Sequence, residues 1–397
     1  MRWERKALIQ KACAAAPGGA ALYQVIQRRF GRLSDDPFRR LPRHAAMLRR
    51  LVDQGFRLDG MRCLEIGTGH LPAAPVGFFL AGASEVVTVD LHRRLNQRLT
   101  ASMLTRLTTY GNRVVDLYEG LIPADLVRRR LAVIADLHGR PVPEILDRIG
   151  VHYEAPGDAS RMPDADGSFD LSFSMSVLEH VTPRALREIL AESRRLLGPA
   201  GFAAHLIDPS DHFAHQDPRI TRINFLRFSG AEWRKVGGNE FSYCNRLRAS
   251  QLERMFIDAG FDIERCERTI DEPSRAALEG GFPLHPDFRR FSAADLCTTE
   301  IEVYAKPRAT ASSAADERAG ETPLAATDAA PMVDAAPMAD APPTVDAAPV
   351  ADGPPTVDAA PMADGGPTVA NHAEAHATSD ARLGRDAAAG RGGGTGV

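Results

Sequence analysis

The chain has 397 residues, a formal net charge of −4 and 44% hydrophobic residues, so it is long enough for a globular domain with a sizeable core. No stretch is long and apolar enough to span a bilayer, and Gln10 and Lys11 interrupt the N-terminal apolar run too early for a secretory signal. Five scattered cysteines without a C-x-x-C pair favour a reduced, cytoplasmic protein.

Composition changes sharply near the C-terminus. Residues 309–397 consist mainly of Ala, Pro, Asp, Gly and Thr, and three successive segments within them repeat the unit V-D-A-A-P-x-A-D-x-x-P-T, at 333–344, 345–356 and 357–368. Large apolar residues are too scarce there to offset the entropy of ordering the chain. We therefore predict a disordered repeat tail at 309–397, a helical N-terminal arm at 1–57 and one α/β domain at 58–308.

The charge is distributed unevenly. Residues 1–50 carry 12 Lys/Arg and 3 Asp/Glu, whereas residues 309–397 carry 4 and 13. A basic arm can contact nucleic acid, an anionic membrane or the acidic tail of its own chain. Because no aromatic stripe accompanies the arginines, a solvated helical surface is the favoured interpretation, and we expect no nucleic-acid partner.

Strands and helices alternate after the arm, which itself reads as helices with breaks at 17–19 and 35–37. The strands are predicted at 62–66, 85–89, 151–154, 169–175, 202–207, 261–267 and 298–305, with helices at 71–80, 183–197 and 249–259 among the connections. This alternation predicts a mainly parallel sheet with helices on both faces. Residues 93–149 read as an inserted group of helices, which forms either a lid over the carboxyl ends of the strands or extra packing on the sheet edge.

The first two strands carry the most specific signal. The run R-C-L-E-I-G-T-G at 62–69 is a buried strand that enters a glycine turn, and the second strand ends in Asp90, 21 residues after Gly69. Such a turn lets backbone approach a ligand, and the acid can accept hydrogen bonds from a ribose diol. The third glycine of a dinucleotide fingerprint is replaced by Pro72, which argues against NAD or FAD.

Five pieces of the chain, in this order, resemble class I S-adenosylmethionine-dependent methyltransferases. They are L-E-I-G-T-G at 64–69, V-D-L at 89–91, G-D-A at 157–159, D-G-S-F-D-L-S-F-S-M-S-V-L-E-H-V at 166–181 and A-G-F at 259–261. The nearest resemblance is to small-molecule methyltransferases with the V-L-E-H-V signature. Leu71 departs from the pattern, because many relatives have a further glycine at that position.

The resemblance implies a Rossmann-like sheet that binds S-adenosylmethionine, and it assigns residues to the cofactor. It places Glu65, Gly67, Thr68 and Gly69 along the methionine and ribose, and Asp90, followed by Leu91, at the ribose hydroxyls. Asp158 would meet the adenine amino group and the backbone N–H of Ala159 the adenine ring. The alternatives remain a tight glycine turn, a helix-capping Asp90 and a turn-forming Asp158. Because Asp90 ends a strand at an exposed edge, we expect it to add little to stability.

Catalytic candidates follow the fourth and fifth strands. We predict His180 and His212 as bases, needed only if the acceptor must lose a proton. The alternatives are a backbone contact at a helix start for His180 and a simple substrate contact for His212. His205, Asp208, Asp211, His212 and His215 include metal-ligand types, but their spacing matches no closed zinc pattern, so no metal is predicted.

Residues 208–248 are predicted to shape the acceptor pocket, with Trp233, Phe241 and Tyr243 either lining it or packing in the core. The predicted function is methyl transfer from S-adenosylmethionine to a small-molecule or glycan-linked acceptor. The alternative is a non-catalytic module of the same fold whose arm and tail bind a partner.

Overall fold

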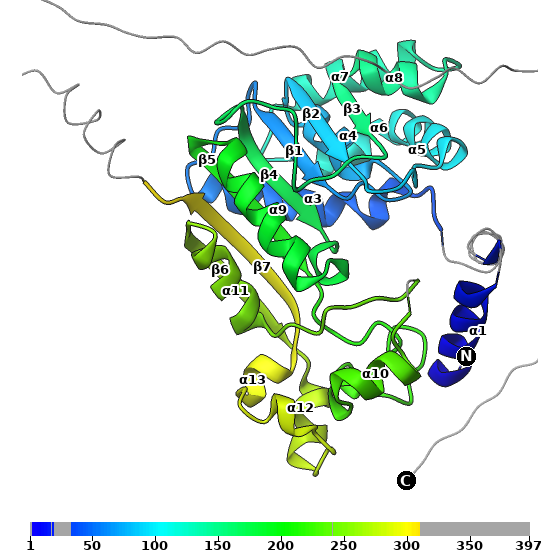
Figure 1. Ribbon diagram of the computed structural model, residues 1–397. Helices are drawn as coiled ribbons and strands as arrows, with labels where there is room; N and C mark the ends of the chain where they lie inside the picture. The colour runs from blue at the N-terminus through cyan, green and yellow to red at the C-terminus, as the bar shows by residue number, and fades with distance from the viewer. Residues whose placement is uncertain (1, 17, 20–32, 240, 310–397) are drawn as a thin grey trace, which may run out of the picture. The chain divides into compact units, whose positions relative to one another are not determined.

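The computed structural model describes residues 2–16, 18–19, 33–239 and 241–309, and they contain one seven-stranded sheet (Figure 1). The strand order is β3-β2-β1-β4-β5-β7-β6. The strands are β1 (Arg62–Ile66), β2 (Glu85–Val89), β3 (Val151–Glu154), β4 (Phe169–Met175), β5 (Leu197–Ile207), β6 (Phe261–Ile270) and β7 (Thr298–Pro307). The first five run parallel, and β7 is antiparallel to both of its neighbours. This confirms the predicted mainly parallel α/β sheet.

The central strands are apolar because both of their faces are covered. Along β1, Cys63 belongs to the core on one side of the sheet and Leu64 to the core on the other. Along β2, Val86 belongs to the first of these cores and Val87 to the second. Successive side chains of a strand point to opposite faces, so these short hydrophobic runs fill two cores at once.

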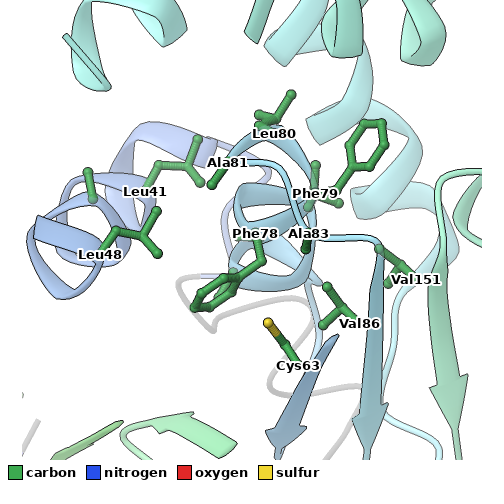
Figure 2. Close-up of a cluster of buried hydrophobic side chains, with 14 of the residues drawn as sticks. Leu41, Leu48, Cys63, Phe78, Phe79, Leu80, Ala81, Ala83, Val86 and Val151 are labelled. Atoms are coloured by element: carbon green, nitrogen blue, oxygen red, sulfur yellow. The ribbon is translucent and has the colours of Figure 1, made fainter. Parts of the chain in front are cut away.

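Helices α3 (Leu41–Asp53) and α4 (Ala73–Leu80) cover one face, after the short turn η1 (Pro37–Arg39). Figure 2 shows Phe78 of α4 between α3 and the sheet. Its ring centroid lies 4.4 Å from that of Phe173 on β4 and 4.5 Å from that of His44 on α3. The first helix after the glycine turn is therefore held between α3 and β4.

The inserted helices pack against α4 on the same side of the sheet. They are α5 (Gln97–Thr109), α6 (Gly111–Leu117), α7 (Ala124–Asp136) and α8 (Val142–Arg148). Arg130 of α7 donates hydrogen bonds of 2.7 Å to the carbonyls of Phe79 and Ala83, which satisfies acceptors at the C-terminal end of α4. Of the two predicted roles for residues 93–149, these contacts support packing.

Helices α9 (Pro183–Leu196) and α11 (Ala249–Asp258) cover the opposite face. In Figure 1, α9 crosses that face of the sheet in front of β4. The Thr182 hydroxyl accepts from the N–H of Ala185 and Pro183 occupies the first turn, so α9 begins where the sequence predicted. The short turn η2 (Leu178–His180) separates β4 from this helix.

A third apolar cluster lies beyond the strand ends and joins segments distant in sequence. It is formed by α1 (Trp3–Ala15), the loop after β5 with η3 (Asn224–Arg227) and α10 (Gly230–Val236), and the elements between β6 and β7, which are α12 (Glu272–Glu279), η4 (Pro286–Phe288) and α13 (Ala293–Leu296). The rings of Trp3 and Trp233 stack at 6.1 Å, and the Trp3 backbone N–H donates to Asp217 at 2.9 Å. The loop after β5 is thus tied to the N-terminal helix.

The predicted strands 62–66, 85–89, 151–154 and 169–175 match the structure, whereas β5 begins earlier and β6 and β7 extend further than predicted. Within the predicted arm, α3 contributes Leu41 and Leu48 to the core of the sheet, so that core extends beyond a boundary at residue 57. The predicted tail, apart from residue 309, lies outside the described residues. Across the described part of the chain, no helix has the length and apolarity to cross a membrane.

Phe78→Ala should lower the free energy of unfolding by about 3–5 kcal/mol, because truncating a fully buried aromatic ring leaves a cavity. Urea denaturation followed by circular dichroism measures the change. Val133→Ala on the exposed side of α7 is the matched control and should stay within about 0.5 kcal/mol of the parent. Equal losses in the two variants would contradict the packing described for α4.

Candidate active site

The turn after β1 brings the first glycine against the turn after β4. Gly67 has a φ of 84° and donates its N–H to the carbonyl of Val89 at 2.8 Å. A Cβ atom at Gly67 would lie 2.7 Å from both methyl carbons of Val177. Gly69 has a φ of 69° and faces open space at its Cβ position. The two glycines therefore serve different purposes, close packing at Gly67 and an open backbone at Gly69.

Asp90 follows β2 and is held in place through one carboxylate oxygen. Its Oδ2 accepts from the Gly69 N–H and from the Tyr153 hydroxyl, both at 3.0 Å, while Oδ1 takes part in neither bond. Burial raises the pKa of this carboxyl, partly offset by the two hydrogen bonds. Asp90 is only 7% exposed, which contradicts the exposed position from which a small influence on stability was expected.

Glu65 in β1 and Thr68 in the turn after it are joined through a hydroxyl of β2. The Thr88 hydroxyl of β2 donates to the Glu65 carboxyl group and also forms a hydrogen bond with the Thr68 hydroxyl. Glu65 is buried, and burial raises its pKa to about 8, with the neighbouring Asp90 charge acting in the same direction. At neutral pH this side chain is therefore mostly a protonated acid.

The loop after β3 approaches the same edge. The Gly157 N–H donates to the Asp90 backbone carbonyl at 2.9 Å, so Asp158 follows directly beside the ribose-site candidate. Its Oδ1 accepts from the N–H of Ser160 at 2.9 Å and from its hydroxyl at 2.7 Å, and these bonds lower the pKa of the Asp158 carboxyl. Ala159 packs partly buried against the second core. Leu91, in contrast, is 66% exposed.

The turn after β4 places a buried acid and an imidazole side by side. Ser176 adopts a φ of 58°, a conformation that is rare outside glycine and frequent at functional sites. Neither carboxyl oxygen of Glu179 has a hydrogen-bond partner among the described residues, and burial raises its pKa to about 8. His180 Nδ1 lies 2.7 Å from the Tyr243 carbonyl and so carries the proton that it donates.

A cavity of about 640 Å³ opens at the carboxyl ends of β4 and β5, beside β6 and β7. Its lining is polar and comprises Arg43, Ser176, Glu179, His180, Asp208, His212, His215, Arg222, Thr269, Asp271, Thr299 and Glu300. None of these residues belongs to the inserted helices. The volume lies within the range of small-molecule sites, about 300–1,000 Å³.

The two predicted catalytic histidines meet in this cavity. The ring centroids of His180 and His212 are 4.9 Å apart, although the residues follow different strands. Burial lowers the pKa of His212 to about 4, despite the nearby Asp208 carboxylate. His205 instead bonds the Ser174 hydroxyl at 2.9 Å within the sheet, and Asp211 accepts from Asn224 at 3.2 Å. These last two side chains do not line the cavity.

Comparison with known proteins adds one sequence match. Residues 135–205, from α7 to β5, match the protein family described as Methyltransferase domain. No curated protein sequence matches the chain. This match and the strand order support a class I S-adenosylmethionine-dependent methyltransferase domain in the chain. S-adenosylmethionine is the cofactor of this enzyme class and methyl transfer is its reaction.

Solved structures give weaker likenesses. One is the 1,6-didemethyltoxoflavin-N1-methyltransferase of Burkholderia thailandensis with 1,6-didemethyltoxoflavin and S-adenosylhomocysteine bound, at 15% identity over 67% of this chain and 77% of that one, with a TM-score of 0.36. Another is an S-adenosylmethionine-dependent methyltransferase of Methanosarcina mazei, at 13% identity over 65% and 98%, with a TM-score of 0.35. At these scores the likenesses carry no argument about this chain.

The residues of the methyltransferase fit an adenosine cofactor at the edge formed by β1, β2 and β3. Gly69 leaves open space beside the turn, and Oδ1 of Asp90 is available to hydroxyl donors. The structure brings Glu65, Thr68 and Asp158 to the same edge through the contacts described above. Their individual roles stay predictions.

Some contacts of the site could not be read from the sequence. Tyr153 holds Asp90 and also accepts from the backbone N–H of Arg94 at 2.9 Å. The only sequence signal was its position in the short strand before G-D-A. Trp233 is buried in the third apolar cluster, so core packing describes it correctly, whereas Tyr243 contributes its backbone carbonyl to His180.

Glu65→Gln should change how stability depends on pH. The pKa of Glu65 is about 8 in the folded protein and lies near 4.5 ordinarily. Its stabilising effect is therefore complete below about pH 4.5 and is lost as pH rises toward 8. The parent should lose up to about 1.4 kcal/mol per pH unit relative to the Gln variant in this window.

Urea denaturation at several pH values between 5 and 8 measures this difference. Glu119→Gln, at an exposed position in the turn after α6, is the matched control and should follow the parent at each pH. Parallel profiles for the parent and Glu65→Gln would contradict a protonated Glu65.

Proposed function

We propose that this methyltransferase transfers the methyl group of S-adenosylmethionine to a polar small-molecule or glycan-linked acceptor that binds in the 640 Å³ cavity. One observation carries the proposal. Val177 packs on Gly67 of the cofactor turn, while its neighbours Ser176 and Glu179 line the cavity. The two sites therefore adjoin at a single turn, which suits a direct transfer between ligands bound on either side.

On the cofactor side, we assign Asp90 Oδ1 to the ribose hydroxyls and Glu65, Gly67, Thr68 and Gly69 to the methionine and ribose. Asp158 has one carboxylate oxygen outside its own turn and is assigned to the adenine amino group, with the Ala159 N–H at the ring. Leu91 is exposed next to Asp90, where an adenine ring would cover it. Burying such a side chain contributes about 1.5–3 kcal/mol when complete.

On the acceptor side, the chain contributes position and polarity. The cofactor supplies an electrophilic methyl group on a sulfonium, and an in-line transfer depends chiefly on how the acceptor atom is held. His180 and His212 face each other in the cavity and are assigned to contact that atom. They accept a proton only where the acceptor must lose one.

The lining favours an acceptor with several hydrogen-bonding groups. Two arginines, four carboxyl side chains, three imidazoles and three hydroxyls surround the cavity, and no purely apolar side chain is among them. All five cysteines are free thiols, which accords with the cytoplasmic location that we propose. The alternative function is a non-catalytic module that binds a partner through its charged termini. It does not account for this polar cavity.

Asp90→Ala should weaken S-adenosylhomocysteine binding about tenfold or more, because about 1.4 kcal/mol of lost hydrogen bonding is a factor of ten. Stability should fall as well, since the Gly69 N–H and the Tyr153 hydroxyl lose their acceptor. Calorimetric titration and thermal melting measure the two effects. Tyr153→Phe should weaken binding less, as it leaves Oδ1 unchanged, and exposed Asp116→Ala should change neither quantity. Unchanged affinity in Asp90→Ala would remove this residue from the site.

Thr299→Trp should block the acceptor and spare the cofactor, because Thr299 lines the cavity from β7 on the far side of β5 from β1. Cell extract incubated with the protein and S-adenosylmethionine labelled on its methyl group reports the acceptor. The variant should lose most of the labelling and bind S-adenosylhomocysteine as the parent does. Thr105→Trp on the exposed side of α5 is the matched control. Full labelling by Thr299→Trp would place the acceptor elsewhere.

A further inference from the structure

Three metal-ligand side chains converge in the loop after β5. Asp208, His212 and His215 each offer one ligand atom, and these atoms all lie within 4.8 Å of one another. Oδ2 of Asp208 is 3.5 Å from Nε2 of His212 and 3.2 Å from Nε2 of His215. Ligand atoms bound to one ion at about 2.0–2.2 Å are separated by about 3.0–3.5 Å. The two distances from Asp208 to the imidazoles are therefore those of neighbouring ligands of a single ion.

The protein fixes the orientation of each group. The Ser210 N–H donates to Oδ1 of Asp208 at 3.0 Å, and the Ser210 hydroxyl bonds the same oxygen, so Oδ2 is the oxygen that faces the two imidazoles. The two rings stack with centroids 4.9 Å apart and planes inclined by 26°. Such an arrangement presents both Nε2 atoms to one side of the loop.

The hydrogen bonding of His212 points to a ligand at its Nε2. Nε2 of the His212 ring is buried and has no hydrogen-bond partner among the described residues, although Oδ2 of Asp208 lies 3.5 Å away. In the neutral tautomer that carries its proton on Nδ1, an imidazole presents a lone pair on Nε2 that can bind a metal ion. A cation between this lone pair and the Asp208 carboxylate would satisfy both groups.

A second group that shares His212 is less suitable. His180, His212 and Cys244 also lie within reach of one ion. However, His180 Nδ1, which lies 3.9 Å from the Cys244 sulfur, already donates its proton to the Tyr243 carbonyl at 2.7 Å. His180 is therefore better placed as a neighbour of the ion than as a ligand shared with Cys244.

We propose that Asp208, His212 and His215 bind one divalent transition-metal ion, with its remaining positions open to the cavity. Two imidazoles and one carboxylate suit Zn²⁺ and similar borderline ions, and sites with three protein ligands leave room for water or substrate. The sequence alone favoured no metal because D-x-x-x-H-x-x-H matches no closed zinc pattern. In the methyl transfer proposed above, the ion would hold an oxygen or nitrogen of the acceptor beside His180. Its binding by the protein does not depend on that role.

Cobalt titration tests the site without an assay of activity. The full chain, purified without a histidine tag and stripped of metal by a chelator, is titrated with Co²⁺ while its visible ligand-field absorption is followed. One equivalent should bind to the parent, and Zn²⁺ should displace it. Asp208→Asn and His215→Gln should each weaken Co²⁺ binding at least tenfold. His152→Gln is the matched control, because His152 also lies near two carboxylates, 3.3 Å from Asp147 and 3.7 Å from Glu85.

S-adenosylhomocysteine calorimetry on the same samples separates the possible failures. Variants that lose Co²⁺ and retain S-adenosylhomocysteine binding support a local metal site in a folded protein. A parent that binds Co²⁺ without binding S-adenosylhomocysteine would support the metal site and refute the proposed function. A parent that binds no Co²⁺ overturns the metal site. The metal site is also overturned if Asp208→Asn and His215→Gln both bind Co²⁺ as the parent does. It is overturned as well if a third variant, Cys244→Ser, loses Co²⁺ binding while those two variants retain it.

Discussion

The contact of Val177 with the backbone of Gly67 is the constraint on which the arrangement of the site depends. A Cβ atom at Gly67 would lie 2.7 Å from the Val177 methyl carbons, so this packing requires a glycine. It brings the turn after β1 against the turn after β4 in a sheet where those strands are neighbours. The cofactor turn and the polar cavity consequently share a wall. In the proposed function, widening this contact would separate the two ligands that methyl transfer must bring together.

Acids at the ends of three strands are held in a common way. Asp90 after β2, Asp158 after β3 and Asp208 after β5 each use one carboxylate oxygen for hydrogen bonds within the protein. These bonds fix the plane of each carboxylate and so set the direction in which its second oxygen points. Such anchoring fixes a carboxylate before its ligand arrives and reduces the entropy lost on binding. The carboxyl edge of the sheet is therefore organised in advance of the ligands that we propose for it.

The peripheral helices support this edge without entering it. Arg130 of α7 bonds the carbonyls at the end of α4, and α4 is held in turn by α3 and β4. On the other side of the edge, Trp3 and Trp233 join α1 to the loop that carries Asp208 and the two histidines. Apolar packing thus sets the position of polar side chains that have few contacts of their own.

The sequence by itself determined the first four strands, the mainly parallel sheet and the location of Gly67, Gly69 and Asp90, because short apolar runs, glycine turns and terminal acids are local signals. It did not determine that Asp90 is buried under Tyr153, that α3 completes the core or that Asp208 faces two imidazoles. Those contacts join residues brought together by strand order and by the packing of helices. Side-chain direction at the end of a strand is set by such neighbours, and only the tertiary structure decides which neighbours meet.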